Sequence, residues 1–282
     1  MSEQTLTITK SDGQKFIIST NRDMRVLTFL PSSPFFNVPY DKIPGRHGEL
    51  DIEGGSFDSR DNIKSRIFFR SKNIYDFNLF RNEIFRLFAS QEPFYITTNR
   101  EPGKRWKVRV ASKYEIEPKG NGTYGVFEII FKSASAFVES VGTTLSPMTF
   151  KSGLWQFGQG LSTELMQYVH RTTSFRIFNA GDVMINPKDF PLLIRFRGSS
   201  ENLKITNKTT GDEWSWTGTT TGDSKTGEVI QLKDVRAFKG VNSIFSRTNF
   251  KLINIAIGWN EFELTGVTGD FYISFDFRFY YL

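Results

Sequence analysis

Apolar and polar residues alternate along several short segments in the first half of the chain. The segment Lys15–Ser19 is one example, and Lys64–Phe69 is another. Alternation with a period of two places apolar side chains on one face of a β-strand and polar side chains on the other. We therefore predict strands at residues 5–9, 15–19, 24–29, 64–69, 93–98, 105–110 and 125–132. Ser11-Asp12-Gly13 separates the first two, and its glycine tolerates the positive φ of a hairpin turn.

One segment has helical periodicity. Over residues 75–89 and just before them, apolar residues recur at offsets of three and four: Ile74, Phe77, Phe80, Ile84, Leu87 and Phe88. This spacing predicts an amphipathic helix with a single apolar stripe. The stripe could contact a partner protein. A small sheet needs cover on one face, however, so we predict that the helix packs on the N-terminal sheet.

The region between the third and fourth predicted strands is rich in proline and glycine. Pro31–Pro44 contains four prolines and is predicted to be a loop, because proline cannot donate a hydrogen bond within a sheet. Gly45–Ile52 is predicted as a polar, glycine-rich strand region. The longer segment Gly45–Ser59 contains Gly54-Gly55 and fits either a long two-stranded arm or an ordered loop.

The second half of the chain has strand patterns and no helical one. Serine, glycine and threonine become frequent at residues 141–153, which predicts a domain boundary. Short strands are then expected at residues 175–178, 192–196, 203–206, 214–216, 228–232, 261–264 and 271–279. Strands at this spacing favour a β-sandwich. We predict an N-terminal domain at residues 1–140, a connecting segment at 141–173 and a C-terminal sandwich at 174–282.

The amino-acid composition and the distribution of charge exclude several classes of protein. The 282 residues include no cysteine, which excludes disulfides and thiolate metal sites, and the net charge is +6. The positive charge is spread over both halves, whereas a dedicated nucleic-acid binder concentrates it, so we expect no sequence-specific nucleic-acid binding. The sequence shows no signal peptide and no apolar run of about 20 residues. We expect synthesis in a cytoplasm and no membrane insertion.

Few residues are suited to catalysis. The two histidines, His47 and His170, are far apart in sequence and lie in no nucleophile motif. The carboxylate pairs Glu115/Glu117 and Glu261/Glu263 each share a strand face, and such pairs are more often solvated than catalytic. Residues 153–160 lack the lysine and hydroxyl of a phosphate loop. We predict no catalytic, cofactor or metal site, and no enzyme activity.

Two groups of residues have a possible binding role. Trp214, Trp216 and Trp259 could stack on sugar rings, although filling a core is the usual role of such bulky side chains. Pro102–Arg109 alternates cations with apolar residues and could meet DNA in a channel. An ordinary half-exposed strand, with Trp106 facing inward, is the favoured interpretation of that segment.

The order of these elements resembles the siphophage distal tail protein family. The resemblance depends on the strand–helix–strand order from Gly45 to Phe137, which ends in Ser133-Ala134-Ser135-Ala136-Phe137. Further matching segments are residues 154–161 at the join, 178–181 at the start of the second domain, and 257–262 before its last strands. The resemblance implies a β-rich α+β belt domain with one short helix, followed by a galectin-like or jelly-roll β-sandwich.

The resemblance also implies a function. Family members are structural virion proteins at the distal end of the tail, where a hexameric ring joins the tail tube to the baseplate and host-adsorption apparatus. The implied partners are other copies of the chain, the tail tube protein, a tail-associated hub or lysin protein, and receptor-binding or baseplate proteins. The alternative is a host-surface glycan-binding module, although the His-Asn-Arg strand of true galectins is missing. Candidate ring contacts lie in the predicted arm: Gly45, Arg46, His47, Glu49, Asp51 and Glu53.

Overall fold

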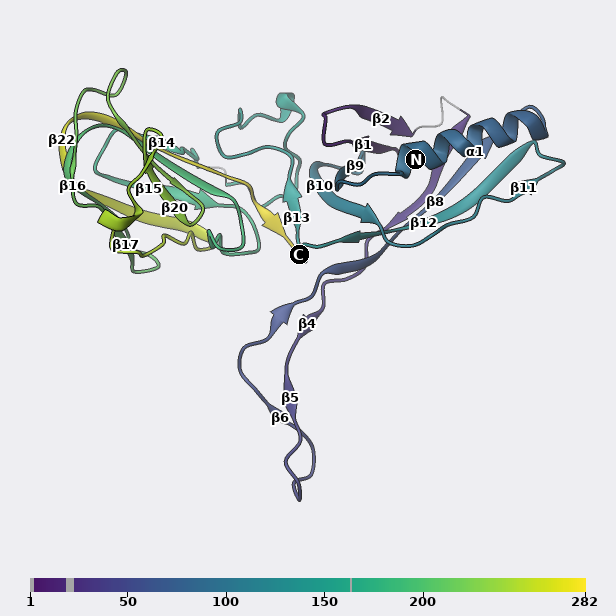
Figure 1. The fold of residues 1–282 in the computed structure, drawn as a ribbon, viewed down its shortest axis with the longest axis horizontal. Coiled ribbons are helices and arrows are strands. Elements are labelled where there is room, and N and C mark those ends of the chain that lie inside the picture. Colours follow the sequence, from purple (N-terminus) through teal and green to yellow (C-terminus); the bar gives the residue numbers. More distant parts are fainter. Residues whose placement is uncertain (1–2, 19–22, 163) are drawn as a thin grey trace. The chain divides into compact units, whose positions relative to one another are not determined.

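The computed structural model describes residues 3–18, 23–162 and 164–282, and its chain forms two compact units. The first unit is Met1–Val138 together with Leu282, and the second is Glu139–Tyr281. The fold is mostly β with one α-helix, as the sequence predicts. Each unit is described below by itself, with the labels of Figure 1.

The first unit is built on an antiparallel sheet. Along the sheet the main strands follow the order β2-β1-β9-β10-β12-β8-β3. The bounds of these strands are β1 Leu6–Thr9, β2 Lys15–Ile18, β3 Met24–Leu30, β8 Arg60–Arg70, β9 Phe94–Thr98, β10 Glu101–Val110 and β12 Tyr124–Ser133. The short strand β11 Pro118–Lys119 pairs with β12 beside this series. Strands β1, β9, β12 and most of β8 bury alternate residues, as the period-two pattern predicts, whereas register shifts interrupt the alternation in β3 and β10. Gly13 has the expected positive φ of 85° in the β1–β2 turn.

Helix α1, Ile74–Phe88, covers one face of this sheet (Figure 1). It begins at Asn73, whose side chain accepts hydrogen bonds from the Tyr75 and Asp76 backbone N–H groups and so caps the first turn. Its apolar stripe meets the sheet at Phe69, whose ring lies 5.1 Å from that of Phe77 and 5.1 Å from that of Phe80. The predicted helix and its packing on the sheet are confirmed.

Between β3 and β8 the chain leaves the sheet as a long pair of extended segments, residues 31–59, which we call the arm (Figure 1). Two short pairs join its outgoing and returning segments: β4 Phe36–Asn37 with β7 Ser56–Phe57, and β5 Tyr40–Asp41 with β6 Leu50–Asp51. Of the two alternatives for Gly45–Ser59, the two-stranded arm is therefore observed. The strand predicted over Gly45–Ile52 is wrong except at β6, because Gly45 and Gly48 both adopt a positive φ of 84° and turn the chain.

The second unit contains a nine-stranded antiparallel sheet, in which β16 and β22 are the long central strands. The bounds of its nine strands are β14 Val169–His170, β15 Ser174–Asn179, β16 Leu192–Asn207, β17 Asp212–Ser215, β18 Thr219–Thr220, β19 Val229–Lys233, β20 Arg236–Lys239, β21 Asn242–Ser243 and β22 Gly258–Phe277. Two further short strands, β13 Val138–Ser140 and β23 Tyr280–Tyr281, pair with each other outside this sheet. Two short 3-10 helices, η1 Phe150–Ser152 and η2 Phe245–Arg247, lie in its loops.

Strands predicted as separate in the second unit are continuous in the structure. Residues 192–196 and 203–206 both belong to β16, and residues 261–264 and most of 271–279 belong to β22. The pairing of β16 with β22 shifts register near Gly198 and Ser200, and Gly198 has a φ of 141°. Such irregularities bend a strand without ending it, because the ladder of hydrogen bonds resumes beyond them.

The predicted connecting segment, residues 141–173, packs within the second unit. Trp155 and Tyr168 are buried, and both rings lie against Phe279 near the end of the chain, at centroid distances of 5.8 and 6.5 Å. The Thr144 hydroxyl donates to the Phe275 carbonyl over 2.7 Å. Thr144, Trp155 and Tyr168 of this segment thus pack against the end of β22 and the residues that follow it. Among the described residues, no helix has the length and hydropathy needed to span a bilayer.

Candidate interaction surface: the arm

The arm exposes an unusual number of large apolar side chains. Seven of them are between 37% and 63% exposed: Phe35, Phe36, Tyr40, Ile43, Leu50, Ile52 and Phe57. A two-stranded ribbon has no second layer, so it cannot bury these groups within itself, and an isolated ribbon is only marginally stable in water. Contiguous apolar surface on a folded protein typically marks a contact with another molecule. The arm is therefore the candidate interaction surface.

Aromatic rings order the base of the arm. Phe36 and Phe57 face each other across the β4–β7 pair, with ring centroids 5.0 Å apart and an edge-to-face geometry. Phe57 makes a second such contact with Phe137, at 5.5 Å. Gly55 lies against the Phe36 ring, and a Cβ atom there would approach that ring to 2.5 Å. Aromatic packing thus gives this end of the arm a defined conformation.

A buried arginine fixes the point where the arm rejoins the sheet. Arg60, the first residue of β8, is buried; its Nε donates to the Ala136 carbonyl over 2.8 Å and its guanidinium also donates to the Ser32 carbonyl. The guanidinium lies 5.3 Å from the centre of the Trp106 ring. Burial lowers the pKa of Arg60, but the hydrogen bonds and the ring favour the cation. The two ends of the arm are thereby tied to one rigid point.

The sequence-predicted contact residues lie at and near the tip of the arm. All six are exposed: Gly45, Arg46, His47, Glu49, Asp51 and Glu53. The arm contains five carboxylates against two cations, a formal net charge of −3 within a chain of net charge +6. One exposed ion pair, Lys42–Glu49 at 3.4 Å, crosses the tip and contributes little stability.

Sequence reasoning missed the apolar part of the arm. Phe35, Phe36 and Tyr40 lie in the proline-rich segment that was interpreted as a plain loop. The signal was present, because large apolar residues interleaved with prolines cannot enter a sheet core and must be covered in another way. The arm thus has an acidic tip and exposed apolar side chains along its length.

The fold and one domain match known phage proteins. Residues 11–133 match a family described as a phage tail protein RIFT-related domain. The structure of SPP1 Dit (gp 19.1) matches with a TM-score of 0.68 and 14% identity, covering 97% of this chain and 99% of that one. The fold is that of a siphophage distal tail protein. The phage P2 baseplate in its activated conformation with Ca matches at 12% identity and a TM-score of 0.47, covering 99% and 98% of the two chains. No curated protein matches in sequence.

In this distal-tail-protein fold, the tryptophans considered for glycan stacking are covered. Trp214 and Trp216 are each 3% exposed. Trp259 is half-buried; the Arg176 guanidinium lies 4.1 Å from its ring centre, and the Phe178 ring lies 4.9 Å away. Arg176 is itself held by an ion pair with Glu164. A sugar ring needs an open aromatic face, and these contacts occupy the faces that it would use.

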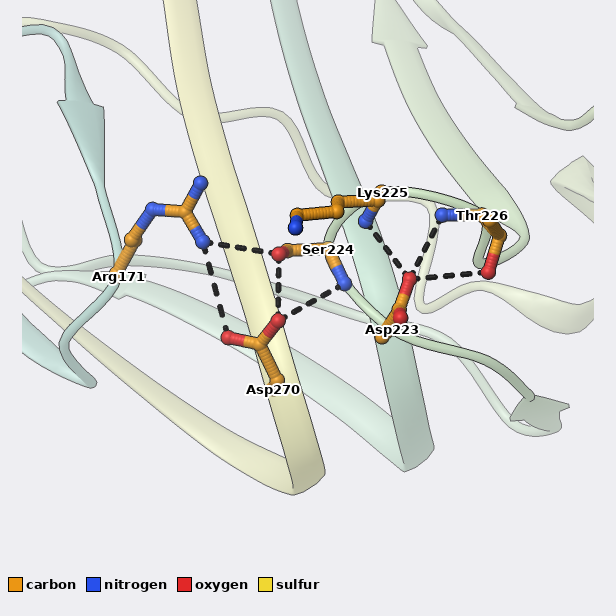
Figure 2. A network of polar contacts seen from close by, with 6 residues as sticks. All are labelled: Arg171, Asp223, Ser224, Lys225, Thr226 and Asp270. Atoms are coloured by element: carbon orange, nitrogen blue, oxygen red, sulfur yellow. Dashed lines mark hydrogen bonds and ion pairs between the residues drawn. The ribbon is translucent and has the colours of Figure 1, made fainter.

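The best-defined polar cluster of the distal-tail-protein fold joins a turn to β22 (Figure 2). Asp270 accepts hydrogen bonds from the backbone N–H and the hydroxyl of Ser224, and Arg171 lies 3.7 Å from its second oxygen. Asp223 accepts from the Lys225 and Thr226 N–H groups over 2.8 and 2.7 Å. These hydrogen bonds lower the pKa of both carboxyl groups, so both are ionised acceptors at neutral pH.

The histidines and the carboxylate pair considered for catalysis are not arranged as a catalytic site. His170 stacks on Phe175 at 4.2 Å, and burial lowers its pKa, so it is neutral at pH 7. His47 lies on the exposed arm tip, in the other unit. Glu263 pairs with Lys208 at 2.9 Å. Over the described ranges, no three His, Asp or Glu side chains converge to hold a metal ion.

Proposed function

We propose that the chain is a structural distal tail protein of a siphophage, acting as a hexameric ring that joins the tail tube to the baseplate. The observation that carries this proposal is the match of residues 11–133 to a phage tail domain, within a chain whose fold matches SPP1 Dit along almost its whole length. That protein is described as a paradigm of the hub adsorption apparatus in phages that infect Gram-positive bacteria.

The arm supports an assembly role. A ring of identical subunits needs a heterologous contact, in which one surface of each copy meets a different surface of the next. An exposed, apolar and acidic projection from the N-terminal unit is suited to be one of these two surfaces. The second unit would present protein surface to neighbouring baseplate components.

The proposed role needs no chemical step. The Asp223 and Asp270 carboxylates of the second unit, which have lowered pKa values, accept hydrogen bonds from backbone and hydroxyl donors of one turn, and Glu228 is paired with Lys239. Glycan binding by the second unit receives no support from its tryptophans, because Trp214 and Trp216 are core residues and Arg176 stacks on Trp259.

Electron microscopy and solution mass test the proposal together. Purified protein at high concentration is expected to give six-fold ring images and a mass six times the 32.4 kDa of one chain. Antibody or gold labelling of intact phage particles should place it at the distal end of the tail. A monomer at all concentrations that also gives no six-fold density on tails would contradict the proposal. Saturable binding on a glycan array would favour the receptor alternative.

A further inference from the structure

The sheet of the first unit has a second face that α1 does not cover. On strands β3, β8 and β12 the buried residues, such as Phe69 and Phe127, face the helix side, and the intervening residues face outward. We call the outward side of β3, β8 and β12, with the adjoining end of β10, the open face. Six of its exposed side chains are cationic: Arg25, Lys64, Arg66, Arg70, Arg109 and Lys132.

The strand register places these cations beside one another. Arg66 lies opposite Glu128, Lys64 lies opposite Ile130, and Arg109 lies opposite Lys132. Residues directly opposite in an antiparallel pair have Cβ atoms about 5 Å apart, so Arg109 and Lys132 repel each other, whereas Arg66 lies beside the opposite charge of Glu128. Two carboxylates, Asp61 and Glu128, share this side of the sheet, which leaves a local excess of four positive charges.

Little within the chain neutralises that excess. Of the six cations, Lys132 alone has an ion pair in the described part of the chain, with Asp61 at 3.0 Å. The Arg25 guanidinium lies over the Phe68 ring at 4.5 Å, which orders the arginine and leaves its charge in place. An exposed sheet face with this charge pattern is stabilised by an acidic partner.

The open face is also partly apolar. Leu30 is 59% exposed and Tyr124 is 37% exposed; the Tyr124 ring stacks with that of Phe68 at 5.9 Å, and Ile130 is half-buried beside Lys64. Phosphate groups bind to cations and hydrogen-bond donors, so exposed leucine and tyrosine side chains would add little to a surface that binds only phosphates. Arginine and aromatic residues together are enriched at protein–protein contacts.

We propose that the open face is the docking surface for the arm of a second copy of this chain, and this inference rests on the ring assembly proposed above. The two surfaces are opposite in charge, and both expose apolar side chains. The arm has a net charge of −3 and seven exposed apolar side chains, whereas the open face has a net charge of +4 with exposed apolar residues between the cations.

The arm is long enough to reach another copy. Each of its two segments has about 14 residues, which at about 3.3 Å per residue extends on the order of 40 Å. Because arm and open face are different surfaces of the same unit, each copy can offer its arm to one neighbour and its open face to the other. This is a head-to-tail arrangement, which forms a ring when the rotation from one copy to the next closes.

Charge reversal on each surface tests the contact. The face variant carries Lys64→Glu, Arg66→Glu and Arg109→Glu; the arm variant carries Glu49→Lys, Asp51→Lys and Glu53→Lys. A matched control changes three exposed cations away from the open face, Lys72→Glu, Arg100→Glu and Lys113→Glu. Sedimentation and electron microscopy measure assembly, and circular dichroism melts verify that every variant is folded.

The proposal predicts a specific rescue. Each variant alone should associate about 100-fold more weakly than wild type, because like charges then meet in every contact. An equimolar mixture of the two variants should assemble again, since every contact in an alternating ring pairs opposite charges. A chain that carries both sets of changes should assemble by itself. The matched control should behave as wild type, and rising salt should weaken wild-type assembly.

The other outcomes each overturn the proposal. If the face variant assembles as wild type does, the open face is not the docking surface, although the ring remains. If single variants fail and neither the mixture nor the doubly changed chain recovers, the two surfaces do not meet. If wild type binds a duplex DNA oligonucleotide and only the face variant loses that binding, without rescue, the open face is a polyanion site. If wild type never associates, in solution or on tails, the ring itself is refuted.

Discussion

The arm of the first unit and the centre of the second unit both contain many large apolar side chains, yet the arm exposes them and the second unit buries them. The difference depends on whether other parts of the chain pack against the strands. Trp214 and Trp216 lie on or just after a strand that pairs with β16, inside a packed sheet, whereas Phe35 and Tyr40 lie on a ribbon with nothing on either side. The sequence indicates that a large apolar side chain favours burial, and the fold determines whether its own chain or another molecule buries it.

The largest effect is expected in the second unit. Trp214→Ala should lower its free energy of unfolding by about 3–5 kcal/mol, because a buried ring is replaced by a cavity. A thermal melt of the protein measures this, and Trp259→Ala is the matched control, since that ring is only half-buried. A melt of the Trp214 variant that is unchanged would mean that the ring is not part of the core.

A smaller loss is expected where the chain enters the second unit. The hydroxyl of buried Thr144 donates to the Phe275 carbonyl and accepts from the Phe277 N–H over 2.7 and 3.1 Å. Thr144→Ala should destabilise the unit by about 1–3 kcal/mol, because two buried backbone groups lose their partner. Chemical denaturation provides the value. Thr144→Ser keeps the hydroxyl and should recover most of the loss, which a mere loss of packing would not allow.

The pH dependence of the second unit should be small and of defined sign. The hydrogen bonds from Ser224 hold the folded-state pKa of Asp270 below its ordinary value of 3.8. The stabilisation is therefore present above that value and is lost as pH falls through the folded pKa. The difference in melting temperature between wild type and Asp270→Asn should be largest near pH 7 and should vanish near pH 2. A difference that persists at pH 2 would assign it to something other than the carboxylate charge.

The smallest effect on stability is expected in the arm. Replacing Phe35, Tyr40 and Ile43 by serine should change the free energy of unfolding by less than about 0.5 kcal/mol per site, because all three are exposed in the single chain. The same changes should abolish assembly. A melt and a sedimentation run on one sample separate the two readouts, and a large loss of stability would show that the arm is covered within its own chain.

Local patterns predicted local structure well. The β1–β2 hairpin and helix α1 followed from period-two and period-3.6 spacing and from one glycine, and the structure has both. The continuity of β16 and β22 could not be predicted, because polar residues within them mimic turns and only pairing with a distant strand holds them extended. The roles of Trp214 and Trp216 stayed open for a similar reason: burial depends on the opposing layer.

The open face could not be found from the sequence. Its six cations are spread over four strands, between Arg25 and Lys132, and no short segment of the chain is conspicuously basic. The strand register brings Arg109 beside Lys132 and places Arg25 across from Phe68. Alternation predicted that these residues face outward, but only the order of strands in the sheet shows that they form one surface.

The prolines of the arm have a consequence for unassembled copies. The outgoing segment contains Pro31, Pro34, Pro39 and Pro44, so four backbone N–H donors are missing along its length. An exposed ribbon with an intact row of donors is a template onto which further strands add, and growth of that kind leads to fibrils. Along the outgoing segment the row of donors is interrupted every few residues, so a neighbouring strand cannot pair continuously with that edge. The outgoing edge of an unassembled copy is therefore a poor template for added strands, while the exposed apolar side chains of the arm remain available for contacts.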